Sequence, residues 1–173
     1  MAQGSDKSGT AVERHVPAYR RMLERVKHEL ADPQGRSLEQ SVESAKQEAI
    51  RSGELDAGEA EAVAGYVSRD LREAGRHLAT SEHELRTWLG IDVSLVEKWL
   101  LDAFMQTADK TRLEWLQLEG GARKPPHRYH AGEVTGPGTL QCLNCGERQR
   151  FYQVAHIPAC PNCGHRTFVR AAV

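Results

Sequence analysis

Hydrophobic residues in the first 118 positions recur at intervals of three and four, which places them along one side of an α-helix. The longest stripe runs through Val12, Val16, Tyr19, Leu23, Val26 and Leu30. Three later stripes follow similar intervals: Leu38, Val42, Ala45 and Ala49; Val63, Val67, Leu71, Ala74 and Leu78; and Val96, Trp99, Leu100, Ala103 and Phe104. The pattern predicts four main helices, of which the last begins at Asp92 or Ser94.

Polar residues mark the starts of two of these helices. Ser37 with Gln40, and Asp56 with Glu59, have the spacing of a capping box, in which each partner accepts a hydrogen bond from the backbone of the other. Because the stripes are narrow and the helices long, the pattern favours an elongated antiparallel helical bundle or a coiled-coil hairpin. A stripe that binds a second copy of the chain is the alternative.

The pattern changes after residue 118. The stretch EGGARKPPH, at positions 119–127, contains two glycines and two prolines and predicts a linker. Short segments and glycine-rich turns follow it, and the candidate strands are Thr139–Gln141, Arg148–Gln153 and Thr167–Arg170. The sequence therefore predicts a mainly α fold followed by a small C-terminal β ribbon. Its predicted parts are a disordered tail at 1–10, a helical domain at 11–118, a linker at 119–132 and the ribbon at 133–173.

All four cysteines lie in this last segment, in two Cys-x-x-Cys pairs separated by fourteen residues: Cys142, Cys145, Cys160 and Cys163. Two sulfurs three positions apart on a tight turn can reach one ion, and a second such turn completes the tetrahedron that zinc prefers. A glycine after each second cysteine permits the positive φ of such a turn. The spacing predicts one Zn²⁺ bound by the four thiolates.

Two other uses of the thiols compete with zinc. Tetrahedral thiolates also suit iron, which would make the ribbon a rubredoxin-like electron carrier. A pair of redox-active Cys-x-x-Cys motifs is disfavoured, because no βαβ pattern surrounds them. Since the protein supplies all four ligands, no position remains for a catalytic water, and we interpret the ion as structural. We expect the nearby His156 and His165 to lie beside the site rather than to bind the ion.

Charge divides the chain in two, although the formal net charge is only −1. Residues 1–118 carry 16 basic and 21 acidic side chains, whereas residues 119–173 carry seven basic and three acidic ones, with four histidines. The basic tail is consistent with a solvated surface, or with contact to nucleic acid or an acidic partner.

Nothing in the sequence indicates a membrane partner. No apolar run reaches the roughly 18 residues of a membrane span, and the first residues lack the apolar segment of a secretory signal. We therefore expect a cytoplasmic protein, in which the thiols stay reduced and bind metal rather than form disulfides.

The motifs around these features resemble one known family. The residues that carry the likeness are Gly53-Glu54-Leu55, Asp70-Leu71, Asp109-Lys110-Thr111, Leu113-Glu114-Trp115, Tyr129-His130, Gly132-Glu133-Val134, Gly136, Gly138, Leu140, the four cysteines, Gly164-His165 and Phe168. In this combination the chain resembles, over nearly its whole length, the bacterial zinc-ribbon-containing proteins of the YbeL type. The resemblance implies an α-helical N-terminal region, a C-terminal metal ribbon and a cytoplasmic location, and it carries over no catalytic residues.

The sequence does not predict an enzyme, because neither a nucleophile with a base nor a phosphate-binding glycine loop is evident. Glu24 with His28, and Glu73 with His77, are interpreted as surface pairs. The favoured function is a metal-stabilised adaptor that binds a protein partner, or a second copy of itself, through the helical region. The electron carrier is one alternative.

A regulator of the transcription machinery is the other alternative. In that case the acidic turn at 54–61, which includes Asp56 and Glu61, would approach a catalytic magnesium ion. Acidic residues near a helix N-terminus also stabilise the helix through its dipole. A structural role at the start of the third predicted helix therefore explains the same turn.

Overall fold

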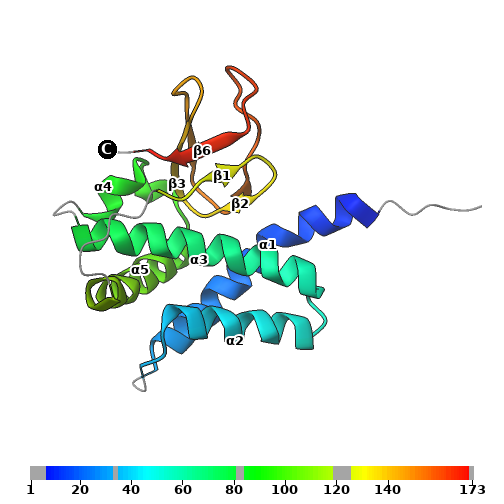
Figure 1. Ribbon diagram of the computed structural model, residues 1–173, viewed down its shortest axis with the longest axis vertical. Helices are drawn as coiled ribbons and strands as arrows, with labels where there is room; N and C mark the ends of the chain where they lie inside the picture. The colour runs from blue at the N-terminus through cyan, green and yellow to red at the C-terminus, as the bar shows by residue number, and fades with distance from the viewer. Residues whose placement is uncertain (1–6, 33–34, 81–83, 119–125, 172–173) are drawn as a thin grey trace, which may run out of the picture.

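The computed structural model describes residues 7–32, 35–80, 84–118 and 126–171 (Figure 1). The helical part consists of α1 (Lys7–Leu30), α2 (Leu38–Arg51), α3 (Ala57–Thr80), α4 (Leu85–Leu89), the 3₁₀ turn η1 (Val93–Leu95) and α5 (Lys98–Leu118). The ribbon consists of β1 (Tyr129–His130), β2 (Val134–Thr135), β3 (Gly138–Cys142), β4 (Arg148–Phe151), β5 (Ala155–His156) and β6 (Thr167–Arg170). The predicted order of a helical region and a small β ribbon is confirmed.

Helix α3 is the centre of the helical part, since it contacts α1, α2 and α5. The predicted stripes face one shared core, in which Tyr19, Leu23, Val67, Leu71 and Phe104 are fully buried. The helices therefore form a bundle in which each stripe is covered by its neighbours. Among the described helices, none combines the length and the apolar character that crossing a membrane requires.

Both predicted capping boxes are confirmed. The Ser37 hydroxyl accepts the N–H of Gln40 at 3.1 Å, and the Gln40 side chain accepts the N–H of Ser37 at 3.0 Å. Asp56 and Glu59 bind each other in the same reciprocal way, at 2.8 and 3.0 Å. These bonds satisfy N–H groups that the first helical turn leaves without partners, and they fix the starts of α2 and α3.

The predicted start of the fourth main helix is wrong. Asp92 accepts both the N–H and the hydroxyl of Ser94, at 3.0 and 2.6 Å, and thereby caps η1 instead of a long helix. Helix α5 begins only at Lys98. Gly90 ends the short helix α4 with a φ of 65°.

The ribbon contains a four-stranded antiparallel sheet in the order β1-β6-β3-β4 and a two-stranded sheet of β2 and β5. Its inward side chains form a small core of Tyr129, Leu140, Cys142, Phe151, Ile157, Cys160 and Phe168. Strands β3, β4 and β6 correspond to the three predicted strands. The sequence did not predict β1, β2 and β5, because a strand of two residues shows no alternating pattern.

Two segment boundaries differ from the sequence prediction. Strand β1 pairs with β6, so the end of the predicted linker at 119–132 belongs to the sheet. Helix α1 begins at Lys7, so residues 7–10 of the predicted disordered tail are helical. The remainder of that tail, and residues 119–125 of the linker, lie outside the described residues.

The ribbon and the bundle share one apolar core. Val134 and Val154 are buried in the same cluster as the bundle side chains. The Thr139 hydroxyl of β3 donates to the Gly90 carbonyl, at the end of α4, at 3.1 Å. In Figure 1 the ribbon lies over α3, and α2 lies on the opposite side of the bundle. These contacts give the ribbon a fixed position relative to the helices.

Candidate metal centre and its connection to the helices

Two tight turns, each formed by a Cys-x-x-Cys-Gly motif, carry the thiols at the end of the ribbon that points away from the bundle (Figure 1). In the first turn the N–H of Gly146 donates to the carbonyl of Cys142 at 3.0 Å, and the N–H of Cys142 donates to the carbonyl of Glu147 at 2.8 Å. The second turn, around Cys160, repeats both bonds at 2.8 Å. The turn glycines have φ values of 76° and 72°, a conformation that a side chain disfavours.

The four sulfur atoms converge on one point. The Sγ atoms of Cys142 and Cys163 are 3.7 Å apart and those of Cys145 and Cys160 are 3.5 Å apart, so each short distance joins one turn to the other. All four Sγ atoms lie within 4.8 Å of one another. A tetrahedron with zinc–sulfur bonds of about 2.3 Å requires sulfur separations of about 3.8 Å, whereas a disulfide requires about 2.05 Å. The thiols therefore fit a four-thiolate metal site.

Hydrogen bonds distinguish the thiols electrostatically. The side-chain amide of Asn162 and the N–H of Glu147 donate to Cys145 and lower the pKa of its thiol to about 6. Burial raises the pKa of Cys160 to about 11, although the N–H groups of Cys163 and Asn162 oppose this effect. A thiolate at Cys145 near neutral pH favours metal binding, because the ion displaces protons from its ligands.

Asn162 provides a direct test of this arrangement. We expect Asn162→Ala to weaken zinc binding by about 10- to 100-fold, the usual effect of removing a partner of a metal ligand. Asn144 occupies the equivalent position in the first turn and is exposed, so Asn144→Ala is the matched control. Competition with a chromophoric chelator measures both affinities. Equal zinc affinities of the two variants would contradict a role for the Asn162 amide.

The two nearby histidines have contacts of their own. His156 lies against the bundle, with Nε2 2.8 Å from the carbonyl of Val12 and Nδ1 3.2 Å from the carbonyl of Gly132. His165 is exposed, and its backbone carbonyl accepts the N–H of Cys160. Within the described residues, the group with metal-ligand geometry consists of the four cysteines.

A buried ionic network joins the ribbon to α1 and α3, and Asp70 is its centre. The fully buried Asp70 carboxylate accepts the Tyr19 hydroxyl at 2.7 Å and the Gly136 N–H at 2.8 Å. Its other oxygen lies 3.2 Å from Nε of Arg69 and 3.7 Å from a guanidinium nitrogen of Arg170. Burial alone would raise the pKa of Asp70, but the two guanidinium groups and the two hydrogen bonds outweigh burial and lower it.

The two arginines extend this network into the ribbon. Arg69, from α3, donates to the Glu133 carboxylate at 2.5 Å and to the Val134 carbonyl at 2.8 Å. Its guanidinium also lies 3.9 Å from the centre of the Tyr129 ring. Arg170, from β6, donates to the Tyr129 hydroxyl at 3.1 Å. Each buried charged side chain of the network is paired with one of opposite charge and is also hydrogen-bonded. Removal of one member would therefore leave its partners less well compensated.

No sequence motif predicted this network. Asp70, Glu133, Gly136 and Gly138 contribute to the family resemblance, but their spacing along the chain indicates no contact between them. The structure explains the two glycines: a β-carbon at Gly136 would lie 2.8 Å from the Tyr19 hydroxyl, and one at Gly138 would collide with Arg170. The one sequence signal for the network was Asp70, a charged residue beside the apolar stripe of α3. Contacts between residues more than sixty positions apart leave no periodic pattern in the sequence.

The interpretation of Glu73 as a surface partner of His77 is wrong. The Glu73 side chain is only 2% exposed, and its carboxylate accepts the N–H of His127 at 3.1 Å. His77 instead stacks on an aromatic ring of α4 at a centroid distance of 5.1 Å. The other proposed pair, Glu24 and His28, does lie at the surface, with 3.3 Å between Nε2 of His28 and a carboxylate oxygen of Glu24.

Comparison with known proteins agrees with this architecture. The sequence matches the zinc-ribbon containing domain family over residues 24–172. The uncharacterized protein YbeL of Escherichia coli strain K12 is 29% identical over 154 residues, which cover 88% of this chain and 92% of that protein. The YbeL proteins of Escherichia coli O6:H1 and O157:H7 give the same values. No solved structure matches the chain.

The family match includes both cysteine turns, the buried network apart from Tyr19, and most of the bundle. The four thiols meet in a small antiparallel ribbon, as the description of that family requires. The chain therefore belongs to the zinc-ribbon containing domain family, together with the YbeL proteins.

Proposed function

We propose that the chain is a non-enzymatic binding module whose ribbon folds around one zinc ion and is positioned by the helical bundle. The observation that carries this proposal is the spacing of the four Sγ atoms, 3.5 and 3.7 Å across the two turns. Four thiolates at this spacing fill a tetrahedron, so no coordination position remains for water or substrate. A cytoplasmic location, where thiols stay reduced, is part of the proposal.

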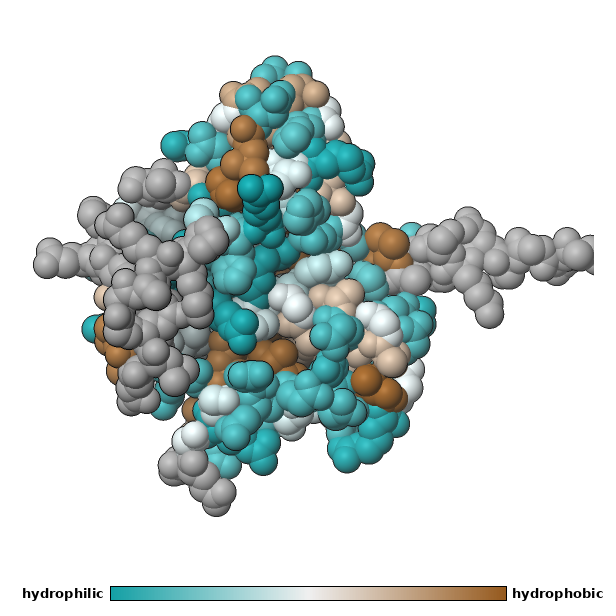
Figure 2. All heavy atoms as spheres, viewed as in Figure 1, coloured by the Kyte–Doolittle hydropathy of each residue, from teal (hydrophilic) through white to brown (hydrophobic). Residues whose placement is uncertain are grey.

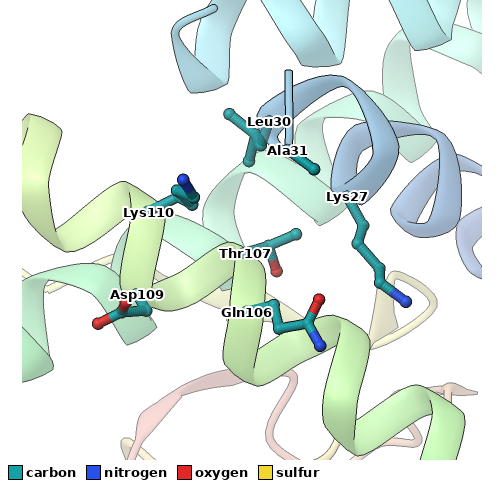
Figure 3. Close-up of a pocket in the computed structure, with 7 residues that line it drawn as sticks. All are labelled: Lys27, Leu30, Ala31, Gln106, Thr107, Asp109 and Lys110. Atoms are coloured by element: carbon teal, nitrogen blue, oxygen red, sulfur yellow. The ribbon is translucent and has the colours of Figure 1, made fainter. Parts of the chain in front are cut away.

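The described surface hollows include one of about 490 Å³ that is lined by residues of α2 alone. A smaller one, of about 170 Å³, lies between α1 and α5, is shown in Figure 3 and does not have the features of a catalytic site. It is lined by Lys27, Leu30, Ala31, Gln106, Thr107, Asp109 and Lys110. The Thr107 hydroxyl already donates to the Ala103 carbonyl at 2.7 Å. The one carboxylate of the lining, that of Asp109, points away from Thr107 in Figure 3. The volume of this smaller hollow is also below the roughly 300 Å³ at which ligand pockets begin.

The carboxylates of the acidic turn at 54–61 are engaged within the molecule. Glu54 binds Arg21 and Arg25 at 2.6 and 2.8 Å, and Glu59 binds Arg14 at 2.7 Å while it caps α3. These partners neutralise charge that an approach to a magnesium ion would require. A protein partner or a second copy bound by the bundle remains part of our proposal, and sedimentation of the zinc-loaded protein tests the second copy.

Metal analysis distinguishes the binding module from an electron carrier. We expect protein purified from its native host to contain one zinc ion per chain and to be colourless, because zinc has a filled d shell. The same preparation should show no reversible reduction in voltammetry. Elemental analysis and the visible absorption spectrum measure the metal directly.

Iron would contradict the proposal. An iron–thiolate centre absorbs visible light and changes oxidation state, and stoichiometric iron would make the electron carrier the better function. Chelation tests separately for a catalytic site. If the protein kept its fold without the ion but lost a measurable reaction, the ion would be catalytic rather than structural.

A further inference from the structure

The outward face of the ribbon sheet carries two arginines on its free edge. Arg148 and Arg150 belong to β4, the edge strand, and both side chains are exposed. Arg148 pairs with Gln141, and side chains of directly opposite residues lie on the same face of a sheet. Leu140 and Phe168 fill the inward face and are fully buried. Two residues apart on one strand, the arginines stand about 6.7 Å from each other.

Neither arginine is neutralised by the protein. Within the described part of the chain, no ion pair or side-chain hydrogen bond involves Arg148 or Arg150. The ribbon has two described carboxylates, and Glu133 is already bound by Arg69 and by His130. Glu147 is the other, and among the described residues no ion pair joins it to either arginine. The face thus presents two arginines without an ion-pair partner in the described ribbon.

The other residues of this face are mostly polar. By register they are His130, Thr139, Gln141, Thr167 and Val169, none of which is acidic and none of which is Phe, Tyr or Trp. Thr139 is buried against Gly90 of the bundle, so the exposed part of the face begins beyond it. Base stacking on single strands requires aromatic side chains, so the face does not favour unpaired bases. In the view of Figure 2, the hydrophobic residues form separate small groups rather than one continuous patch.

We propose that this arginine face, defined by Arg148, Arg150 and Gln141, binds the phosphodiester backbone of duplex nucleic acid without sequence specificity. The inference rests on the proposed function and names its partner. Arginine guanidinium groups pair with phosphate oxygens, and the Gln141 amide adds a neutral donor. In Figure 1 the helical bundle lies below the ribbon. An acidic protein is the competing partner.

The test uses full-length, zinc-loaded protein and a labelled DNA duplex of about 20 base pairs, with an RNA duplex of equal length as a second probe. We expect binding to weaken as KCl rises from about 50 to 200 mM. Fluorescence anisotropy should show that Arg148→Ala/Arg150→Ala binds more than about tenfold more weakly at 100 mM KCl. Loss of two phosphate contacts should also lower the slope of log K against log[KCl] by about 1.8. The ratio of the DNA and RNA affinities identifies the preferred duplex.

Two control variants separate the arginine face from net charge and from folding. Arg51→Ala/Arg112→Ala removes the same charge from exposed positions of the bundle and should leave the affinity unchanged. Arg148→Lys/Arg150→Lys keeps the charge and should restore most of the binding lost in the alanine variant. Zinc content and circular dichroism of each variant establish that the fold is intact.

Three results would overturn the inference. They are equal affinities of the wild type and the alanine variant, an equal loss in the bundle control, and equally tight binding to poly-glutamate of the same charge. The last result would assign the face to an acidic protein. Zinc content measured on the same samples distinguishes failure of this inference from failure of the proposed function. Iron in place of zinc would contradict the proposed function. Zinc-loaded protein that binds neither duplex would contradict only the inference about the arginine face.

Discussion

Replacing Cys163 with serine is expected to unfold the ribbon while most of the helical bundle stays helical. A structural zinc site contributes about 10–16 kcal/mol of binding free energy, which exceeds or matches the whole stability of a typical domain. The ribbon core has only seven buried hydrophobic residues, too few to hold it without the ion. Heteronuclear NMR should show the cross-peaks of residues 126–171 collapsing to unfolded positions.

The matched control lies in the other turn. Asn144→Ser changes an exposed side chain of the same size class and leaves all four thiols in place, so its spectrum should remain that of the wild type. Chelation of the wild-type protein should reproduce the Cys163→Ser spectrum. A ribbon that keeps its dispersed cross-peaks after the ion has been removed would refute the structural role of the metal.

Asp70→Asn is expected to have the second-largest effect, a loss of about 3–5 kcal/mol in the free energy of unfolding. The substitution keeps the shape of the side chain but leaves Arg69 and Arg170 buried without their counter-charge. For a chain of this length the loss corresponds to a fall of roughly 6–20 °C in Tm. Asp109→Asn is the control: it removes an exposed ion pair of 3.9 Å, which contributes at most about 1 kcal/mol.

The same pair of proteins gives a pH prediction. Because the pKa of Asp70 is lower in the folded state, its contribution is complete above the pKa of an unfolded aspartate, about 3.9. It is lost only as pH falls through the still lower folded pKa. The stability difference between wild type and Asp70→Asn should therefore stay constant from neutral pH to about 4 and then shrink. Denaturant titrations at each pH measure it, and a difference that grows on acidification would contradict the assignment.

Local signals in the sequence were sufficient for the helices and for the thiols. The 3–4 spacing of Leu38, Val42, Ala45 and Ala49 placed all four residues in the core. Ser37 identified the first turn of α2, because a capping box is completed within four residues. The Cys-x-x-Cys-Gly turns are equally local, since each is closed by hydrogen bonds between neighbours.

Features that depend on distant contacts were not predicted. Val12 fits its stripe but is 47% exposed, because α1 extends past the other helices at this end. Asp92 is a residue type that commonly caps long helices, yet its hydrogen bonds cap the single 3₁₀ turn η1. The ionic network around Asp70 required α1, α3 and the ribbon to be assembled first, and the position of the ribbon on the bundle followed from it.

The fixed position of the ribbon on the bundle has an electrostatic consequence. Because the basic ribbon and the acidic bundle stay at a constant separation, the molecule has a permanent electric dipole moment. Independent tumbling of the two parts would average that moment. In the field of a polyanion such a dipole is turned before contact, cationic end first. The association rate constant with a polyanion should then be higher than the size of the basic surface alone would give. This increase in rate should disappear once salt shortens the range of the field.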